Sequence, residues 1–177
     1  MSYITIIALI LSVISILYYC YGIYAAYQFF SEKTTIATDF HPPVTILKPL
    51  CGLDFDTYQN LLSCCEQDYP QYQIIFSVKD SHDPSIKIVE KLINQFPDLD
   101  IELVISDRII GANLKVSNLN NALTKAKYDI LIIADSDIRV NQDYLKTIIQ
   151  PLKQENVGVV TCLYRSVGDD WISSMES

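Results

Sequence analysis

The first part of this chain lacks charge. No Asp, Glu, Lys or Arg lies between Tyr3 and Phe30, and the run is largely apolar and rich in tyrosine. A membrane-spanning helix needs about 20 apolar residues to cross roughly 30 Å of hydrocarbon, so the run predicts a transmembrane helix over residues 3–30. A cleaved signal peptide is the alternative. It fits less well, because no Lys or Arg precedes the run, the run is too long, and no small-residue cleavage site follows it.

Cysteine patterns that indicate disulfides or zinc are also missing. The five cysteines include Cys20 within the apolar run and the adjacent pair Cys64 and Cys65, and no C-x-x-C motif occurs. Such a distribution is typical of core thiols in a reducing compartment. It favours a cytosolic location for the part of the chain outside the membrane. Lys33 is the only basic residue near the apolar run, so the positive-inside signal for orientation is weak.

An excess of basic residues is absent as well. The chain has 13 Lys and Arg residues against 21 Asp and Glu residues, a formal net charge of −8. Glu32, Lys33 and Asp39 contribute −1 of this, which leaves −7 for the chain beyond residue 41. Surfaces that follow nucleic-acid phosphates are basic, so no nucleic-acid partner is expected. An anionic ligand would need a metal ion or locally placed lysines.

The remainder of the chain alternates between short apolar runs and amphipathic stretches, after a linker at residues 31–43 that ends in Pro-Pro. Strands are predicted at residues 44–50, 73–80, 100–106, 129–135 and 157–164. Helices are predicted at residues 56–67, 83–97, 114–127 (helical from about residue 117) and 141–154. Strands that alternate with helices of about 10–15 residues predict a doubly wound α/β domain.

Polar residues mark the expected starts of these helices. Asp56, Asp83 and Asn141 are plausible N-caps, and Pro84 suits the first helical position after Asp83. The segment 129–135, "DILIIAD", is apolar up to its last residue. Such a run is typical of a strand in the middle of a parallel sheet.

A dinucleotide-binding fingerprint is missing from this α/β pattern. No G-x-G-x-x-G follows the first predicted strand, and Gly52 and Gly111 are isolated. The glycines of that motif let the backbone approach a pyrophosphate, so a nicotinamide-dependent Rossmann enzyme is disfavoured.

Polar residues follow three of the predicted strands at their carboxyl ends, where open α/β sheets bind ligands. They are Lys48, Asp80 and the pair Asp135 and Asp137. On an extended chain Asp135 and Asp137 point the same way, and two like charges held together are costly unless a cation neutralises them. Carboxylate oxygens suit Mg²⁺ or Mn²⁺. The alternative is an ordinary acidic strand-to-helix turn.

Four segments together resemble the ceramide glucosyltransferase family and related bacterial lipid glycosyltransferases, which are inverting enzymes with a GT-A fold. They are "VTILKPLCGLD", "QDYPQYQIIFSVKDSHDP", "GANLKVSNLNNAL" and "YDILIIADSDIRV". The resemblance runs from about residue 42 to the end. It implies a GT-A (Rossmann-like) nucleotide-sugar-binding domain over residues 44–177, preceded by the one transmembrane helix.

The resemblance also implies roles for individual residues. The loop Lys48–Asp54, with Lys48 as a substrate-binding residue, would border the nucleotide. Asp80 would bind the uracil–ribose end of a UDP-sugar, and Lys115 would lie near the diphosphate, where its charge offsets phosphate charge. Asp135 and Asp137 match the metal-binding D-x-D motif for Mg²⁺ or Mn²⁺. Asp137 would contact the metal directly, and Asp135 would lie nearer the ribose.

Three residues also have simpler interpretations. His82, on the same loop as Asp80, is expected to be a polar turn residue. Lys115 could equally be a solvated loop lysine. Arg139 could pair with the acidic residues or stack near the sugar, and structural support of the D-x-D loop is the favoured interpretation.

The chain departs from the family pattern near its end. The family's catalytic-base aspartate and its Q/R-x-x-R-W motif lie well downstream of the D-x-D motif. Here Trp171 stands in no such context, and Asp169 and Asp170 come too early to be the base. We therefore expect an incomplete, donor-binding half of the domain, with the general base of the inverting reaction beyond the chain end.

The resulting functional hypothesis is a membrane glycosyltransferase. It would transfer a hexose, glucose in the first instance, from a UDP-sugar to a membrane lipid such as ceramide, with inversion. The catalytic domain would face the cytosol from a single- or multi-pass membrane protein. The alternative is a non-catalytic, truncated remnant without UDP-sugar turnover.

Overall fold

The computed structural model describes residues 2–31 and 39–164. The chain divides into two units, one up to residue 35 and one from residue 36 onward, and each is described by itself. The predicted linker at 31–43 lies mostly outside the described residues. Asp169, Asp170 and Trp171 lie outside them entirely.

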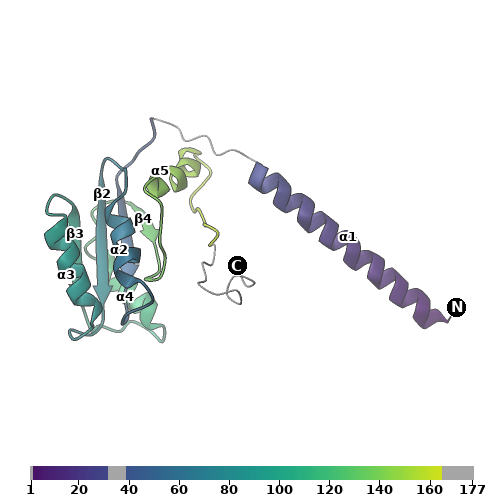
Figure 1. The fold of residues 1–177 in the computed structure, drawn as a ribbon, viewed down its shortest axis with the longest axis horizontal. Coiled ribbons are helices and arrows are strands. Elements are labelled where there is room, and N and C mark those ends of the chain that lie inside the picture. The colour runs from purple at the N-terminus through teal and green to yellow at the C-terminus, as the bar shows by residue number, and fades with distance from the viewer. Residues whose placement is uncertain (1, 32–38, 165–177) are drawn as a thin grey trace. The chain divides into compact units, whose positions relative to one another are not determined.

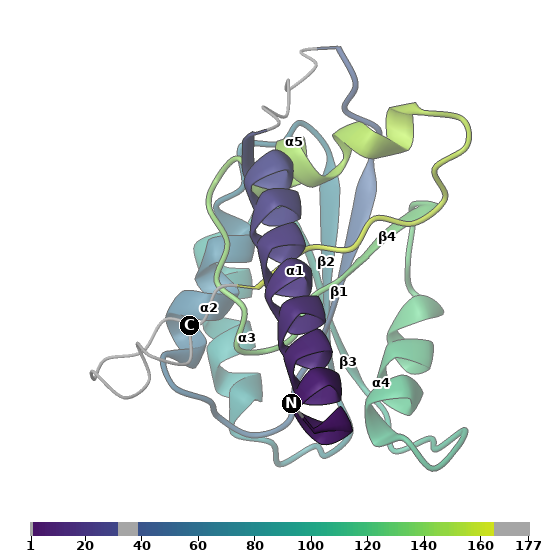
Figure 2. The same cartoon turned by 90° about the vertical axis from the view of Figure 1, so that its right-hand side faces the viewer.

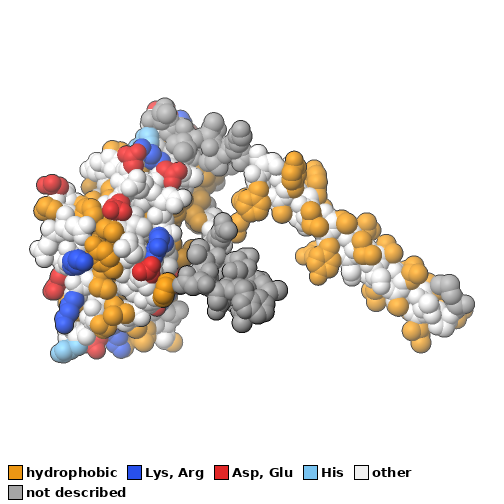
Figure 3. All heavy atoms as spheres, viewed as in Figure 1, with side chains coloured by type: hydrophobic (Ala, Val, Ile, Leu, Met, Phe, Trp, Pro, Cys, Tyr) orange, Lys and Arg blue, Asp and Glu red, His pale blue; other side chains and the backbone are white. Residues whose placement is uncertain are grey.

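The first unit is a single apolar helix, α1 (Tyr3–Ser31), in the place where the sequence predicts one. It buries none of its residues, and its most apolar stretch has a mean hydropathy of 2.3. Hydrophobic side chains lie along its length, with no charged group among them (Figure 3). At 1.5 Å per residue its 29 residues extend roughly 44 Å, more than the thickness of a hydrocarbon core. By length and composition, α1 can cross a membrane.

The second unit contains a four-stranded parallel sheet, made of β1 (Val44–Pro49), β2 (Tyr72–Val78), β3 (Asp100–Ile105) and β4 (Ile130–Ile133) (Figure 1). Their order is β3-β2-β1-β4. The chain therefore adds β2 and β3 on one side of β1 and then crosses to place β4 on the other side. In open α/β sheets, the point where the strand order reverses is the usual ligand crevice. Here it lies between β1 and β4.

Three helices cover the two faces of this sheet. Both α2 (Thr57–Cys65) and α3 (Ser85–Gln95) lie on one face, and α4 (Leu114–Leu123) lies on the other (Figure 2). The larger core cluster joins the first face to α2 and α3, and a smaller cluster joins the other face to α4. Because strand side chains alternate, Ile46 belongs to the larger cluster and Leu47 to the smaller one. The doubly wound arrangement is as predicted.

The helix predicted over residues 141–154 is broken. The structure has a short α5 (Tyr144–Ile148) followed by a 3₁₀ turn, η1 (Gln150–Lys153), with Pro151 in its first turn. Proline has no backbone N–H, and its ring clashes with the carbonyl four residues earlier, so an α-helix cannot continue through it. The prediction that Asn141 begins the helix is also wrong, because α5 begins at Tyr144.

Two strand predictions also need correction. Residues 157–164 form no strand, because they do not pair with a neighbouring strand in the described part of the chain. For the same reason β4 is an edge strand there and not a middle one, and Leu131 and Ile133 stay exposed. An apolar run indicates that a segment tends to be buried, but it does not indicate whether a neighbouring strand is available to pair with it.

The starts of the helices differ in how they are capped. Asp56 has a left-handed backbone (φ 57°) and makes no side-chain cap, so its predicted capping role is wrong. The N-cap of α3 is Pro84 and not Asp83, and the helix begins at Ser85 and not at Pro84 as predicted; Asp83 Oδ1 nevertheless accepts a hydrogen bond from the Ser85 backbone N–H at 2.9 Å. The side chain of Asn113 caps α4, which therefore begins at Leu114, earlier than predicted.

Candidate functional site

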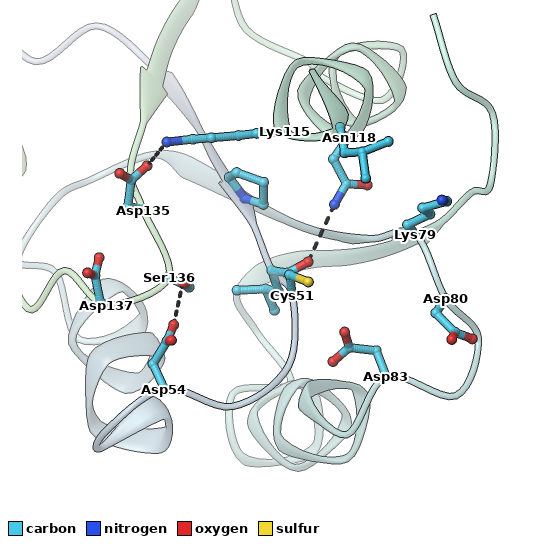
Figure 4. Close-up of a pocket in the computed structure, with 13 residues that line it drawn as sticks. Cys51, Asp54, Lys79, Asp80, Asp83, Lys115, Asn118, Asp135, Ser136 and Asp137 are labelled. Carbon is cyan, nitrogen blue, oxygen red and sulfur yellow. Dashed lines mark hydrogen bonds and ion pairs between the residues drawn. The ribbon is translucent and has the colours of Figure 1, made fainter. Parts of the chain in front are cut away.

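A cavity of about 400 Å³ opens at the carboxyl ends of β1, β2 and β4. Residues after each of these strands line it, together with the first turns of α4. Figure 4 shows Asp135 and Asp137 on one side of the cavity and Lys79 and Asp80 on the other, with Lys115 and Asn118 entering from α4. Four of the five predicted site residues line the cavity: Asp80, Lys115, Asp135 and Asp137. The fold therefore brings together residues that are up to 57 positions apart in sequence, from Asp80 to Asp137.

The two carboxylates of the D-x-D motif have different surroundings. Asp135 Oδ1 lies 2.5 Å from Lys115 Nζ, in an ion pair whose side chains are about half exposed. The carboxylate of Asp137 is exposed and has no hydrogen bond or ion pair to any described residue. The pair therefore leaves one complete carboxylate, and one oxygen of the other, available to a ligand.

Lys48, the fifth predicted site residue, lies elsewhere. Its side chain is fully buried, and it is not among the residues that line the cavity. Its Nζ donates hydrogen bonds to the backbone carbonyls of Asp135 at 2.6 Å and Ile138 at 3.1 Å. Burial lowers the pKa of Lys48, while Cys64 and the Asp137 and Asp135 carboxylates act in the opposite direction. The prediction that Lys48 contacts the nucleotide does not fit this position.

Asp80 lies at the far side of the cavity on an exposed turn. Its Oδ1 accepts a hydrogen bond from the His82 backbone N–H at 2.8 Å, and the His82 ring lies 3.3 Å away. The hydrogen bonds from the His82 backbone and ring lower the pKa of Asp80. The expected turn role of His82 agrees with this geometry.

Asp83 belongs to the cavity lining but was taken from the sequence only as a helix cap. Its Oδ2 accepts a hydrogen bond from the Gly52 backbone N–H at 2.8 Å, while its Oδ1 accepts from Ser85. It therefore ties the β1–α2 loop to the start of α3. Burial acts to raise the pKa of Asp83, but the bonds from Ser85 and Gly52 outweigh it and lower the pKa. The adjacency of this residue to Asp80 was the signal that could have placed it in the site.

The turn that carries the D-x-D motif is anchored to the β1–α2 region. Ser136 Oγ donates a hydrogen bond to Asp54 Oδ2 at 2.5 Å. Arg139 pairs with Asp56 at 2.6 Å and donates to Asn60 Oδ1 at 3.2 Å. Arg139 thus supports the loop structurally, as favoured from the sequence, and does not enter the cavity.

Asn118 is a buried lining residue that the sequence did not single out. Its Nδ2 donates to the carbonyls of Ser77 at 3.1 Å and Leu50 at 3.4 Å. Its Oδ1 is buried and accepts no hydrogen bond within residues 2–31 and 39–164. Buried polar atoms usually have a partner, so this oxygen is suited to accept from a bound ligand. The pattern "NLNNAL" alone gave no signal that distinguishes this asparagine from its neighbours.

The charges of the lining bear on whether a divalent cation fits. The acidic lining residues are Asp54, Asp80, Asp83, Asp135 and Asp137, and the basic ones are Lys79 and Lys115. No group of three or more His, Cys, Asp or Glu side chains that could enclose a metal ion occurs in the part of the chain that the structure describes. Mg²⁺ in nucleotide sites is commonly bound by one or two carboxylates plus substrate phosphates. Asp135 and Asp137 fit that donor set.

Comparison with known proteins agrees with this geometry. The model of the family described as glycosyl transferase family 21 matches residues 7–176. The chain belongs to glycosyl transferase family 21. A ceramide glucosyltransferase from Komagataella phaffii is 34% identical over 157 residues, which cover 84% of this chain and 30% of that protein. A ceramide glucosyltransferase from Candida albicans is 36% identical over 123 residues, which cover 63% of this chain and 23% of that protein. The resemblance stated from the sequence is confirmed.

Solved structures place this family 21 chain among GT-A glycosyltransferases. A mannosyltransferase from Pyrobaculum calidifontis, in complex with GDP-Man and Mn²⁺, superposes with a TM-score of 0.67 at 26% identity, over 85% of this chain and 43% of that one. S. aureus TarS 1–349 in complex with UDP shares the fold, with a TM-score of 0.50 at 23% identity, over 62% of this chain and 32% of that one. The predicted GT-A parallel-sheet fold is confirmed, and this chain spans less than a third of the length of its curated relatives.

Proposed function

We propose that the cavity binds a UDP-sugar together with Mg²⁺ or Mn²⁺, as the donor site of a family 21 glycosyltransferase. The observation that carries the proposal is the juxtaposition of Asp80, Lys115, Asp135 and Asp137 at the β1/β4 switch point. The mannosyltransferase that shares this fold is in complex with a nucleotide-sugar and Mn²⁺, which supports the choice of ligand.

Each residue has a role in this proposal. Asp137 and Asp135 would hold the cation, whose contribution is to stabilise the departing diphosphate. Lys115 offers its ammonium group to the same diphosphate, because its Nζ already lies against Asp135. Asp80 would accept hydrogen bonds from the uridine end, across the cavity from the cation. Lys115 and the cation together offset the negative charge of both the lining and the ligand.

We propose further that the whole protein transfers a hexose, glucose in the first instance, to a membrane lipid such as ceramide, with inversion. Two observations support it: the relatives named above are ceramide glucosyltransferases, and α1 can cross a membrane. Inverting transfer needs a general base that takes the proton of the acceptor hydroxyl as it attacks. We assign that step to no residue of this chain, and the described residues are proposed to supply donor binding.

The test is a calorimetric titration of the full chain in detergent with UDP, with and without Mn²⁺. We expect saturable UDP binding that requires Mn²⁺, since the acidic lining opposes a diphosphate when no cation is present. Binding that is absent under both conditions would contradict the proposal and favour a non-catalytic remnant.

A further inference from the structure

Lys48 has a charged side chain on an otherwise apolar face of the sheet. It lies near the end of β1 with Val44 and Ile46 four and two positions before it, on the face of the sheet that packs in the larger core cluster. Its side chain is 0% exposed. Burying an ammonium group is costly unless it is paired or hydrogen-bonded, so the groups that bind the Lys48 ammonium should indicate its role.

Beside Cys64, the partners of Lys48 include two backbone carbonyls of one turn. They belong to Asp135 and Ile138, which bracket Ser136 and Asp137. Ile138 N also donates to Asp135 O at 3.3 Å and closes the same turn. One cation therefore fastens both ends of the segment that carries the D-x-D carboxylates.

The position of Lys48 separates it from the ligand. It is not a lining residue of the cavity, whereas Asp135, Ser136 and Asp137 all are. It can therefore affect a ligand without touching it, through the turn and through the attraction between its charge and the Asp137 and Asp135 carboxylates. A neutral side chain of the same length would fill a similar volume but would remove one donor from each carbonyl, and only the Asp135 carbonyl would keep a second donor, Ile138 N.

We propose that Lys48 is a positioning residue that holds the Asp135–Ile138 turn in its binding conformation before any ligand enters. The inference rests on the proposed function, because it concerns the same donor site. The sequence predicted that Lys48 contacts the nucleotide directly. In this proposal Lys48 instead contacts the backbone of the turn that carries the carboxylates. The consequence is that a substitution at Lys48 weakens metal-dependent binding although no atom of Lys48 touches the metal or the nucleotide.

The experiment compares Lys48→Met with Thr45→Val in the full chain. Thr45 is also fully buried on β1, and its hydroxyl bonds Gln73 and the Tyr128 backbone N–H, away from the turn. Both variants remove a buried polar group from one strand, so both should lower the melting temperature. Only Lys48→Met is expected to weaken Mn²⁺-dependent UDP binding, by roughly tenfold or more, as for a lost charge-assisted hydrogen bond.

The outcomes separate the two hypotheses. If the unsubstituted chain binds no UDP with Mn²⁺, the proposed function fails. If it binds UDP and a folded Lys48→Met variant binds equally well, the positioning role of Lys48 is wrong. Equal losses in Thr45→Val and Lys48→Met would also overturn it, because they would indicate a general effect of core destabilisation.

A measurement on the unsubstituted chain tests the same point if Lys48→Met does not fold. Hydrogen–deuterium exchange should find the Ile138 amide, which closes the turn, already protected without ligand, and UDP with Mn²⁺ should add little protection. An Ile138 amide that exchanges freely until UDP and Mn²⁺ are present would contradict a preformed turn.

Discussion

Asp135 and Asp137 are two residues apart but differ in the partners of their carboxylates. The Asp135 carboxylate is held by Lys115, whereas the Asp137 carboxylate has no hydrogen-bonding partner among the described residues. An exposed side chain without a hydrogen bond or ion pair to the described residues contributes little to folding, so its substitution should separate stability from ligand binding.

We expect Asp137→Asn to abolish Mn²⁺-dependent UDP binding while changing the free energy of unfolding by less than about 0.5 kcal/mol. The amide is a weaker ligand than the carboxylate and removes one of the two negative charges that a cation would neutralise. Calorimetry and urea unfolding measure the two effects. Asp98→Asn is the matched control, since Asp98 is also exposed and precedes β3 at the opposite edge of the sheet. Unchanged UDP affinity in Asp137→Asn would argue against a metal role for this residue.

Lys115 competes with a cation for Asp135. Lys115→Met should therefore raise the Mn²⁺ affinity of the nucleotide-free chain, by up to about fivefold, the size expected when a half-exposed ion pair is removed. It should lower the affinity for UDP by roughly tenfold, because the diphosphate loses a charged donor. Titrations with Mn²⁺ alone and with UDP at saturating Mn²⁺ distinguish the two effects.

Lys127→Met is the control for Lys115→Met. Lys127 pairs with Asp100 at 2.6 Å with similar exposure, and neither residue lines the cavity. Lys115 is expected to leave Asp135 and pair with the phosphates when UDP binds. If Lys115→Met changed the Mn²⁺ affinity and the UDP affinity in the same direction, this expectation would be wrong.

At the scale of elements, the start of α3 joins stability to the shape of the site. Asp83 accepts a hydrogen bond from the backbone N–H of Ser85, the first residue of this helix, and another from Gly52 in the β1–α2 loop. The pKa of Asp83 is lowered in the folded chain. Its contribution to stability is therefore present above the unfolded pKa, about 3.9, and is lost as the pH falls through the lower folded value.

Asp83→Ala is expected to lower the free energy of unfolding at pH 7 by about 1 kcal/mol, the usual size for loss of a side chain that accepts a hydrogen bond at the start of a helix. The difference from the unsubstituted chain should shrink as the pH falls from about 4 through the lower folded pKa of Asp83, below which neither chain has the charged carboxylate. Urea unfolding across this pH range measures it. Asp143→Ala is the control, since Asp143 precedes α5 without any side-chain cap bond. A difference that stays constant with pH would mean that the Asp83 charge is not what stabilises the start of α3.

The elements also differ in how well the sequence predicts them. The strands β1, β2, β3 and β4 lie within about two residues of their predicted bounds, because each is a short run, largely apolar or alternating between polar and apolar residues as in β3. The helix over 141–154 and the strand over 157–164 failed for different reasons. The helix prediction did not take Pro151 into account. The strand prediction required a neighbouring strand, and the pattern of apolar residues does not show whether one is present.

At the scale of the whole molecule, the remaining question is where the second unit of the chain resides. We proposed from cysteine usage that it faces the cytosol. The structure offers a direct way to test this, because Cys51 and Cys162 are free and exposed, whereas Cys64 and Cys65 are buried.

In sealed microsomes with the cytosolic face outward, a membrane-impermeant maleimide is expected to label the chain without detergent. The Cys51→Ser/Cys162→Ser double variant is expected to lose this labelling, because the buried thiols react slowly and Cys20 lies within α1. Labelling measured by a mass shift gives the result. A chain that is labelled only after detergent is added would place the domain on the luminal side.

The sequence by itself determined the apolar helix, the α/β class, the family and four of the lining residues, because each of these depends on a local pattern or on a short motif. Only the tertiary structure decided that Lys48 lies beneath the D-x-D turn and that Asp83 and Asn118 join the lining. It also decided that Lys115 pairs with Asp135, whereas Asp137 pairs with no residue in the described ranges 2–31 and 39–164. These facts depend on which segments pack together across the β1/β4 crossover, and contacts between residues 48 and 138 have no signature in the order of neighbouring residues.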